Sequence, residues 1–303
     1  MGEFSDFQRT ILQLLQGMKV SCNELLSKHT SFRIGGPAEV MVFPKDAEEL
    51  SKALKTAALL GVKPRVLGAG TNILASDNGL DGMVICLKDC LNGIDLIKPA
   101  TIRVSAGVTM TRAAVFAAKH GLSGMEFAHG IPGTVGGGVY MNAGAYGGEI
   151  KDICSNVTVM GDEGTCRTFS ADEMAFSYRH SRLMEKPGIV VSAEFQLLQA
   201  ETSAITEKMQ ILMNKRSTSQ PLDFPSAGSA FKRPAGGYAA ALIEKAGLKG
   251  LRFGNAAVSE KHSGFIVNLG GATAADVKAL LSTVSDRVYE KTGIRLEPEV
   301  CIW

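Results

Sequence analysis

The sequence predicts an α+β protein of two or three domains. Its 303 residues are about twice the length of one typical domain. Strand-like and helix-like patterns alternate in the first 120 residues. Glycine contributes 34 residues, about 11% against ~7% in an average protein, and these glycines gather in a few segments. Together the three observations favour short βαβ pieces that are connected by glycine-rich loops.

Residues 39–67 predict one βαβ unit with a right-handed crossover. The run EVMVFP predicts a strand, and Asp46, three residues before Glu49, predicts the start of a helix. Apolar residues then recur with helical spacing as far as Gly61, which would end the helix. VKPRVL predicts the second strand, and it leads directly into the segment GAGTN.

The remaining elements are predicted from the same periodicities. Strands are expected at 83–88, 101–107, 154–160 and 188–198. Helices are expected at 109–121, where Thr109 would be the cap, in a segment that ends near Arg216, around 239–246 and through 277–288. Residues 124–148 consist mostly of loop signals.

Charge and composition argue against several classes of protein. Thirty-two Lys and Arg against 30 Asp and Glu leave a formal charge of +2, which supplies no basic field for nucleic acid. No apolar run approaches the roughly 20 residues that span a bilayer, and no signal peptide is visible. The six cysteines form no Cys-x-x-Cys pair and are expected to be buried thiols, and the five histidines lack metal-ligand spacing. We therefore expect a cytoplasmic protein without a metal, membrane insertion or a nucleic-acid partner.

Two glycine-rich segments are the most informative feature of the sequence. Residues 67–72 follow a predicted strand, and the second segment runs through 130–149. Glycines without a Cβ let backbone amides approach a phosphate closely. The first segment is not a Rossmann fingerprint, because Ile73 stands at the third glycine position, and it is not a Walker loop. A tight turn explains it equally well on its own, and a linker could explain the second, but the two together suggest an extended dinucleotide held from both sides.

Six motifs resemble those of one enzyme family, in that family's order over nearly the whole chain. They are HTSFRIGGPA at 29–38, LGAGTNIL at 67–74, GMEFAHGIPGTVGGGVYMNAGAYGGE at 124–149, FSYRHS at 176–181, PSAGSAFKRP at 225–234 and LEPEV at 296–300. On these motifs the chain resembles the UDP-N-acetylenolpyruvoylglucosamine reductases, which complete UDP-N-acetylmuramate synthesis for bacterial peptidoglycan. It looks like their shorter subtype, which lacks a substrate-capping tyrosine loop.

The resemblance implies a fold and a set of domains. We expect a two-part FAD-binding domain of the vanillyl-alcohol-oxidase (PCMH-type) kind and a smaller α+β substrate-binding domain. The FAD-binding parts would be residues 1–86 and 87–214, and the substrate-binding domain would be 215–292. The C-terminal strand, within 293–303, would return to the first part.

The resemblance also implies the chemistry. The chain would be an NADPH-dependent flavoprotein oxidoreductase acting on a C=C bond. It would hold FAD non-covalently and convert UDP-N-acetylglucosamine enolpyruvate to UDP-N-acetylmuramate. Such a reaction needs a fixed cation, an acid partner and a deliverable proton.

Site residues are carried over from the matching motifs. The catalytic residues would be Arg179 as the cation, Ser229 as the proton donor and Glu299 as the acid partner. Glu297 would share a strand face with Glu299, so periodicity does not choose between them and only the motif position selects Glu299. The substrate would contact Tyr178, Lys232 and Lys261. The residues implied to bind FAD are Gly68, Ala69, Gly70, Thr71, Asn72, Gly133, Thr134, Gly136, Gly137, Asn142, Ala143, Gly144 and Ala145.

Two alternatives belong to other functional classes. The first is an FAD-dependent oxidase of the same superfamily, in which flavin is often attached covalently through His or Cys. His129 is the one histidine near a glycine-rich segment. The second is a non-catalytic nucleotide-sugar-binding protein, which is disfavoured because all three catalytic positions are occupied as in the family.

Overall fold

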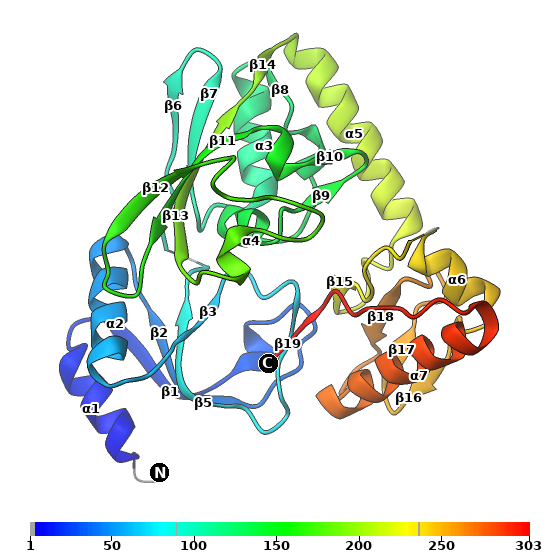
Figure 1. Cartoon of the computed structure of the whole chain (residues 1–303), viewed down its shortest axis with the longest axis horizontal. Coiled ribbons are helices and arrows are strands. Elements are labelled where there is room, and N and C mark those ends of the chain that lie inside the picture. The colour runs from blue at the N-terminus through cyan, green and yellow to red at the C-terminus, as the bar shows by residue number, and fades with distance from the viewer. Residues whose placement is uncertain (1–3, 89, 236) are drawn as a thin grey trace. The chain divides into compact units, whose positions relative to one another are not determined.

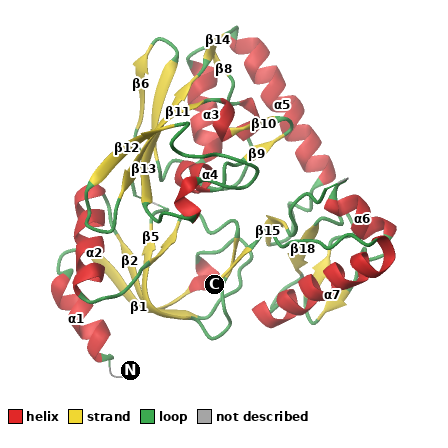
Figure 2. Cartoon of the chain, viewed as in Figure 1, coloured by secondary structure: helices red, strands yellow, loops and turns green. Residues whose placement is uncertain are grey.

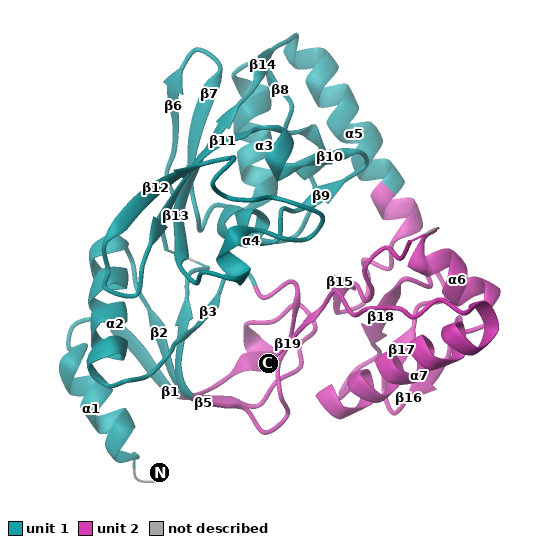
Figure 3. Cartoon of the chain, in the orientation of Figure 1, with its two compact units in different colours: residues 1–22, 40–69, 82–215 teal, residues 23–39, 70–81, 216–303 magenta. Residues whose placement is uncertain are grey.

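The computed structural model describes residues 4–88, 90–235 and 237–303, which form two compact units (Figure 3). Unit 1 comprises residues 1–22, 40–69 and 82–215. Unit 2 comprises residues 23–39, 70–81 and 216–303. Each unit therefore combines segments that lie far apart in the sequence.

A four-stranded sheet with two helices is built from the N-terminal part of the chain (Figures 1 and 2). Its strand order is β1-β2-β5-β3, so β5 separates the two strands of the predicted βαβ unit, and β3 runs parallel to β5. Helix α2 begins as predicted, because Asp46 accepts a hydrogen bond from the Glu49 N–H at 2.9 Å. It ends just before Gly61, whose φ is +66°. The elements are α1 (Asp6–Leu14), β1 (Lys19–Leu25), β2 (Pro37–Phe43), α2 (Ala47–Leu59), β3 (Arg65–Leu67) and β5 (Leu80–Cys86).

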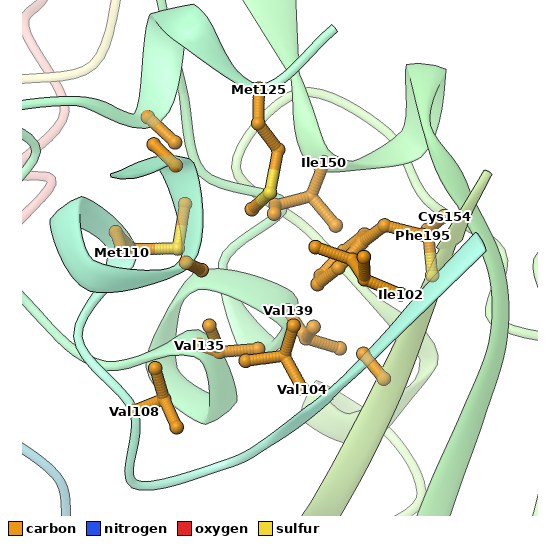
Figure 4. Close-up of a cluster of buried hydrophobic side chains, with 14 of the residues drawn as sticks. Ile102, Val104, Val108, Met110, Met125, Val135, Val139, Ile150, Cys154 and Phe195 are labelled. Carbon is orange, nitrogen blue, oxygen red and sulfur yellow. The ribbon is translucent and has the colours of Figure 1, made fainter. Parts of the chain in front are cut away.

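Unit 1 also contains a five-stranded antiparallel sheet, in the order β12-β11-β13-β7-β6. Helices α3 and α4 bury apolar side chains in the same core as β7 and β13, including Met110, Val139, Val104 and Phe195 (Figure 4). Thr109 caps α3 as predicted, accepting from the Arg112 N–H at 3.2 Å. The main elements are β6 (Ile94–Lys98), β7 (Thr101–Ser105), α3 (Met110–Lys119), α4 (Val135–Tyr140), β11 (Cys154–Met160), β12 (Cys166–Ser170) and β13 (Ile189–Gln196). Shorter elements are β8 (Leu122–Ser123), η2 (Glu126–Ala128), β9 (Gly144–Ala145), β10 (Gly148–Glu149), η3 (Ile150–Asp152), η4 (Arg182–Met184) and β14 (Leu198–Gln199), and α5 (Thr202–Ser219) follows them.

Helix α4 corrects the expectation that residues 124–148 are mostly loop. Three of its six residues are glycine, which disfavours a helix when propensity alone decides. Tertiary packing overrides that preference here. A Cβ added to Gly136 would lie 2.9 Å from Ala106 Cβ, and one added to Gly138 would lie 2.8 Å from Met110 Sδ. Glycine therefore lets α4 pack closely against its neighbours.

Unit 2 contains a second core around the sheet β15-β18-β17-β16, whose strands pair antiparallel. Helices α6 and α7 pack on this core, and both were predicted. The short C-terminal strand β19 pairs in parallel with β4, Cys301 lying opposite Ile73. The elements are η1 (Leu26–Lys28), β4 (Ile73–Leu74), β15 (Ser226–Ser229), α6 (Ala239–Lys245), β16 (Arg252–Phe253), β17 (Ala256–Val258), β18 (Phe265–Asn268), α7 (Ala274–Thr292) and β19 (Cys301–Ile302).

The cysteines do not all match the expectation of buried thiols. Cys86, Cys90 and Cys154 are buried, whereas Cys166 is exposed. The prediction was wrong for Cys166 because it lies on β12, an edge strand with most of its residues open to solvent. Burial raises the pKa of both Cys90 and Cys154 to about 12.

Two kinds of feature are absent from the described residues. None of the helices within them is both long enough and apolar enough to cross a membrane. Across the same parts of the chain, no group of three or more His, Cys, Asp or Glu side chains is placed to hold a metal ion.

Candidate functional site

The two glycine-rich segments lie against each other in unit 1. A Cβ added to Gly68 would lie 2.8 Å from Thr134 Oγ1, so the approach depends on glycine. Gly68 and Ala69 follow strand β3, and Thr134 caps α4 by accepting from the Gly137 N–H at 3.5 Å. Gly133, whose φ is +124°, leads into this cap. The contact brings together two segments that the sequence assigns to one FAD site.

Gly137 differs from its glycine neighbours in α4. It is exposed, and the nearest atom to an added Cβ is Thr134 Oγ1 at 3.7 Å, an ordinary van der Waals distance. Packing inside the protein therefore does not require a glycine at this position, whereas it does at Gly136 and Gly138. Close approach of a bound molecule is a physical reason for glycine here.

The stretch 142–145 connects α4 to the hairpin of β9 and β10. Asn142 is 0% exposed and has a φ of +43°, a left-handed conformation that Asn tolerates better than most residues. A Cβ added to Gly144 would lie 2.6 Å from Glu149 Cβ, so pairing with β10 requires glycine. Ala143 and Ala145 are half-buried.

Arg179 lies at the tip of a tight turn in unit 1. The Ser177 N–H donates to the His180 carbonyl at 3.2 Å, and the His180 N–H donates back to the Ser177 carbonyl at 3.1 Å. Arg179 has a φ of +54° in a turn position that usually carries glycine. Its Nη2 donates to the Gly144 carbonyl at 3.2 Å, and its Cζ lies 5.1 Å from the ring centroid of Tyr178. A strained backbone that holds a charged residue points to a functional role for that residue.

Glu126 is the first residue of η2, and His129 follows its last residue. His129 Nδ1 is buried and has no hydrogen-bond partner among the residues that the structure describes. Glu126 is 3% exposed, and its carboxylate accepts from Ser123 Oγ at 2.6 Å and from the Gly124 N–H at 3.0 Å, with Lys208 Nζ at 3.4 Å. Burial alone would raise the pKa of Glu126, but these donors and Lys208 hold it below its ordinary value.

Ser229 ends strand β15 in unit 2 and is exposed. Ser226 pairs with Val267 and Ser229 pairs with Phe265, so β15 contains a bulge between its two ends. Gly228 within this bulge has a φ of +75°, which requires glycine or a strained residue. The bulge therefore sets the direction of the Ser229 side chain at the end of the strand.

The segment of Glu299 runs antiparallel to the residues that follow Ser229. The Glu299 N–H donates to the Ala230 carbonyl at 2.9 Å, and the Lys232 N–H donates to the Glu297 carbonyl at 2.9 Å. Asn72 Nδ2 donates to the Glu299 carbonyl at 3.1 Å. Unit 2 thus brings together Asn72, Glu299 and the strand end that carries Ser229.

The two glutamates that the sequence left undistinguished have different surroundings. The Glu297 carboxylate is exposed and forms an ion pair with Lys232 Nζ. Glu299 is half-buried. Burial is the main cause of the raised pKa of the Cys301 thiol, and the negative charge of Glu299 raises it further. The less solvated position of Glu299 suits a group that must interact with a buried charge.

The other predicted residues are divided between the two units. Gly70 belongs to unit 2, where an added Cβ would meet the His29 carbonyl oxygen, and Thr71 is half-buried. Lys261 is exposed, and its Nζ donates to the Ser217 carbonyl at 2.7 Å. Arg179 and Tyr178 belong to unit 1, whereas Ser229, Glu299, Lys232 and Lys261 belong to unit 2.

Sequence reasoning missed one carboxylate that organises unit 2. Asp77 Oδ1 accepts from the Ala274 N–H at 2.7 Å, and its Oδ2 accepts from the Ala275 N–H at 3.0 Å. Asp77 therefore binds the first amides of α7 from a segment 197 residues away. Nothing in the local sequence signals this, because a cap from a distant segment has no fixed spacing.

Known proteins of the same kind match the chain over almost its whole length. One family model, described as an FAD binding domain, matches residues 38–170, and another, described as the C-terminal domain of UDP-N-acetylenolpyruvoylglucosamine reductase, matches residues 220–303. The chain is 45% identical over 290 residues to the UDP-N-acetylenolpyruvoylglucosamine reductase of Caldanaerobacter subterraneus subsp. tengcongensis, covering 96% of this chain and 95% of that protein. It is 42% identical over 291 residues to the same reductase from Latilactobacillus sakei, covering 96% and 95% respectively. The crystal structure of the Thermus caldophilus reductase matches with a TM-score of 0.81 and 37% identity, covering 94% of this chain and 99% of that chain.

Fold and comparisons together define a flavoprotein, with an FAD-binding domain followed by a smaller α+β domain. The chain belongs to the UDP-N-acetylenolpyruvoylglucosamine reductase family. The resemblance found in the sequence is confirmed, and so is the expected α+β fold with an FAD-binding domain and a second, smaller domain.

Proposed function

We propose that this chain reduces the enolpyruvyl group of UDP-N-acetylglucosamine enolpyruvate with electrons from NADPH, the reaction for which its family is named. The product is UDP-N-acetylmuramate, a precursor of bacterial peptidoglycan. One observation carries the assignment of the chemistry to particular residues. Unit 2 places the Glu299 segment and the strand end of Ser229 side by side, through the hydrogen bond between the Glu299 N–H and the Ala230 carbonyl.

The residues of unit 1 fit an FAD. Gly68 and Thr134 bring two glycine-rich segments into contact, and exposed Gly137 leaves its backbone open beside them. His129 Nδ1, buried and unpartnered in the described protein, fits an atom whose partner belongs to a bound molecule. FAD would be held non-covalently by the residues assigned to it from the sequence, Asn142 through its backbone because its side chain is bound to Glu149, Ser177 and Lys151. When bound, FAD accepts a hydride from NADPH and passes it to the substrate.

Three residues of the chain stabilise the negative charge that forms on the substrate and supply the proton that the reaction needs. As hydride reaches the methylene carbon of the enolpyruvyl ether, negative charge develops on the adjoining carboxylate. The positive charge of the Arg179 guanidinium opposes that charge. The Ser229 hydroxyl delivers a proton to the neighbouring carbon, which balances the hydride. Glu299 is the acid partner of this site.

Substrate contacts and domain bounds are part of the same proposal. Tyr178, Lys232 and Lys261 contact the UDP-sugar, and Lys232 is oriented by its ion pair with Glu297. The FAD-binding domain comprises residues 1–86 and 87–214, the substrate-binding domain comprises 215–292, and 293–303 return to the first part. The division between the compact units after Lys215 and the pairing of β19 with β4 support these bounds. The cytoplasmic location expected from the sequence stays a prediction.

The oxidase and non-catalytic alternatives are not favoured, because the C-terminal family model and the relatives that match almost the whole chain are named as the reductase. A product assay tests the proposal. The purified holoprotein, given NADPH and UDP-N-acetylglucosamine enolpyruvate, should consume NADPH and yield a UDP-sugar heavier by one hydride and one proton. NADPH consumption that needs oxygen and leaves the UDP-sugar unchanged would instead identify an oxidase.

A further inference from the structure

Two segments of unit 1 are joined by three hydrogen bonds that the proposed chemistry does not use. Ser181 Oγ donates to the Tyr140 carbonyl at 2.7 Å, and Asn142 Nδ2 donates to the Ser177 carbonyl at 2.9 Å. The third bond runs from Arg179 Nη2 to the Gly144 carbonyl at 3.2 Å. We call these three bonds the turn clamp. They connect the stretch 140–144 to the turn 177–181.

Asn142 is the central member of the turn clamp. Asn142 is 0% exposed, and both polar atoms of its side chain have protein partners. Besides the Ser177 carbonyl, Nδ2 donates to Glu149 Oε2 at 3.0 Å, and Oδ1 accepts from the Lys151 N–H at 2.9 Å. A buried amide with every partner satisfied holds its neighbours firmly, because losing it would leave buried groups unpaired.

The Ser177 carbonyl connects Asn142 to Arg179. That carbonyl also accepts from the His180 N–H at 3.1 Å, which closes the two-residue turn carrying Tyr178 and Arg179. The turn holds Arg179 at a φ of +54°, a conformation that a non-glycine residue adopts only when its surroundings impose it. The turn clamp supplies that constraint from both ends, at Ser177 and at Ser181.

We propose that Asn142 is a positioning residue for Arg179, with Ser181 as its auxiliary. The bonds of Asn142 fix the turn, and the turn fixes where the guanidinium lies before substrate arrives. This inference rests on the proposed role of Arg179, and it assigns the Asn142 side chain to the substrate-reducing step, not to a direct contact with FAD. An arginine that is already held in place stabilises the developing charge more than one that must be ordered during the reaction.

The first test is made on the protein without substrate. Asn142→Gly removes the amide and tolerates the left-handed backbone, and Ser181→Ala removes a second bond of the clamp if the first variant folds poorly. Asn156→Ala is the matched control, since Asn156 Nδ2 also donates to a glutamate, Glu194 Oε2, at 2.9 Å. Hydrogen exchange of the peptide over 176–182 should be faster by about tenfold in the clamp variants and unchanged in the control. Unchanged exchange in both clamp variants would overturn the positioning role, whatever the protein catalyses.

The second test separates positioning from catalysis. In stopped-flow experiments, Ser181→Ala should leave flavin reduction by NADPH unchanged. Asn142→Gly should slow flavin reoxidation by the enolpyruvyl substrate by about tenfold or more beyond any effect that it has on flavin reduction. In an Arg179→Ala background the same change should have no further effect, because the two residues act as one unit. An equal slowing with and without Arg179 would overturn the inference. If Arg179→Ala alone leaves reoxidation intact, the proposed role of Arg179 fails, and the exchange result still shows whether Asn142 holds the turn.

Discussion

Asn72 Nδ2 donates a hydrogen bond to the backbone carbonyl of Glu299 at 3.1 Å and joins residues 227 positions apart. The Cys301 N–H returns a bond to the Asn72 carbonyl at 2.9 Å, so the last strand of the chain is fixed on the loop after Gly70. The same last segment binds the Ala230 carbonyl next to Ser229. One residue of a glycine-rich loop thus helps to place both the proposed acid partner and the strand beside the proposed proton donor.

Ser229→Ala should separate the two half-reactions. Flavin reduction by NADPH should remain close to the wild-type rate, whereas reoxidation by the enolpyruvyl substrate should fall by about 100-fold or more, because the proton donor is lost. Rapid-mixing absorbance measurements of each half-reaction check this. Equal losses in both would show that Ser229 has a structural role and does not deliver the proton.

Gly137→Ala should weaken FAD binding without weakening the fold. A Cβ here has 3.7 Å to its nearest neighbour, and alanine favours a helix over glycine by roughly 0.5–1 kcal/mol. The apoprotein should therefore melt at the same temperature or higher, while the FAD dissociation constant rises by about tenfold or more. Titration of the apoprotein with FAD gives the affinity. Gly161→Ala, in the turn before β12, is the control, because a Cβ added there would lie 3.9 Å from its nearest neighbour. An affinity loss of the same size in both variants, or in neither, would contradict the account.

Local chemistry explains what the sequence predicted correctly. Asp46, Thr109 and Gly61 act on their own helices within four residues, so their patterns are readable without the fold. The three glycines of α4 predict a loop by the same local rules, and the packing of Gly136 on Ala106 and of Gly138 on Met110 overrides that preference. Prediction from local pattern fails there because the deciding contacts are tertiary.

In the candidate site, too, local sequence predicts some features, and tertiary contacts decide the others. Motif positions named Arg179, Ser229 and Glu299, but nothing local distinguished Glu299 from Glu297, since both face the same way along a strand. The difference arises from Lys232, which binds Glu297 across a pairing between residues 65 positions apart. The positive φ of Arg179 and the buried bonds of Asn142 are likewise properties of the folded chain.

Glu126→Gln should lower stability and change its dependence on pH. The wild-type carboxylate has a pKa below the ordinary value of 4.5, so its stabilising effect is complete above that pH and is lost as the pH falls through the folded-state pKa. Glutamine removes the charge that Ser123, Gly124 and Lys208 bind. The free energy of unfolding should fall by about 1–3 kcal/mol at pH 7, and the difference from wild type should shrink below about pH 4.5.

Urea unfolding across that pH range tests the Glu126 prediction. Glu207→Gln changes an exposed carboxylate of helix α5 and is the matched control, with a stability change expected within about 0.5 kcal/mol. A Glu126→Gln difference that stays constant down to acid pH would mean that the carboxylate is not charged in the folded protein.

Cys166 should react first with thiol reagents. It is exposed, whereas burial raises the pKa of Cys90 and Cys154 to about 12, so that these two carry almost no thiolate at pH 8. Brief treatment of the native protein with iodoacetamide, followed by peptide mass spectrometry, should find Cys166 modified and Cys90 and Cys154 intact. Cys166→Ser should remove the fast-reacting thiol, and early modification of Cys154 would contradict the packing described for unit 1.

The absorbance spectrum of the purified holoprotein, recorded anaerobically before and after NADPH and again after UDP-N-acetylglucosamine enolpyruvate, tests the central claim most directly. The account predicts flavin bands that bleach with NADPH and return with the enolpyruvyl substrate, with no oxygen present. Bands that stay bleached until air is admitted would contradict the proposed reductase. A protein that remains colourless after FAD is supplied would contradict the assignment of the glycine-rich segments as well.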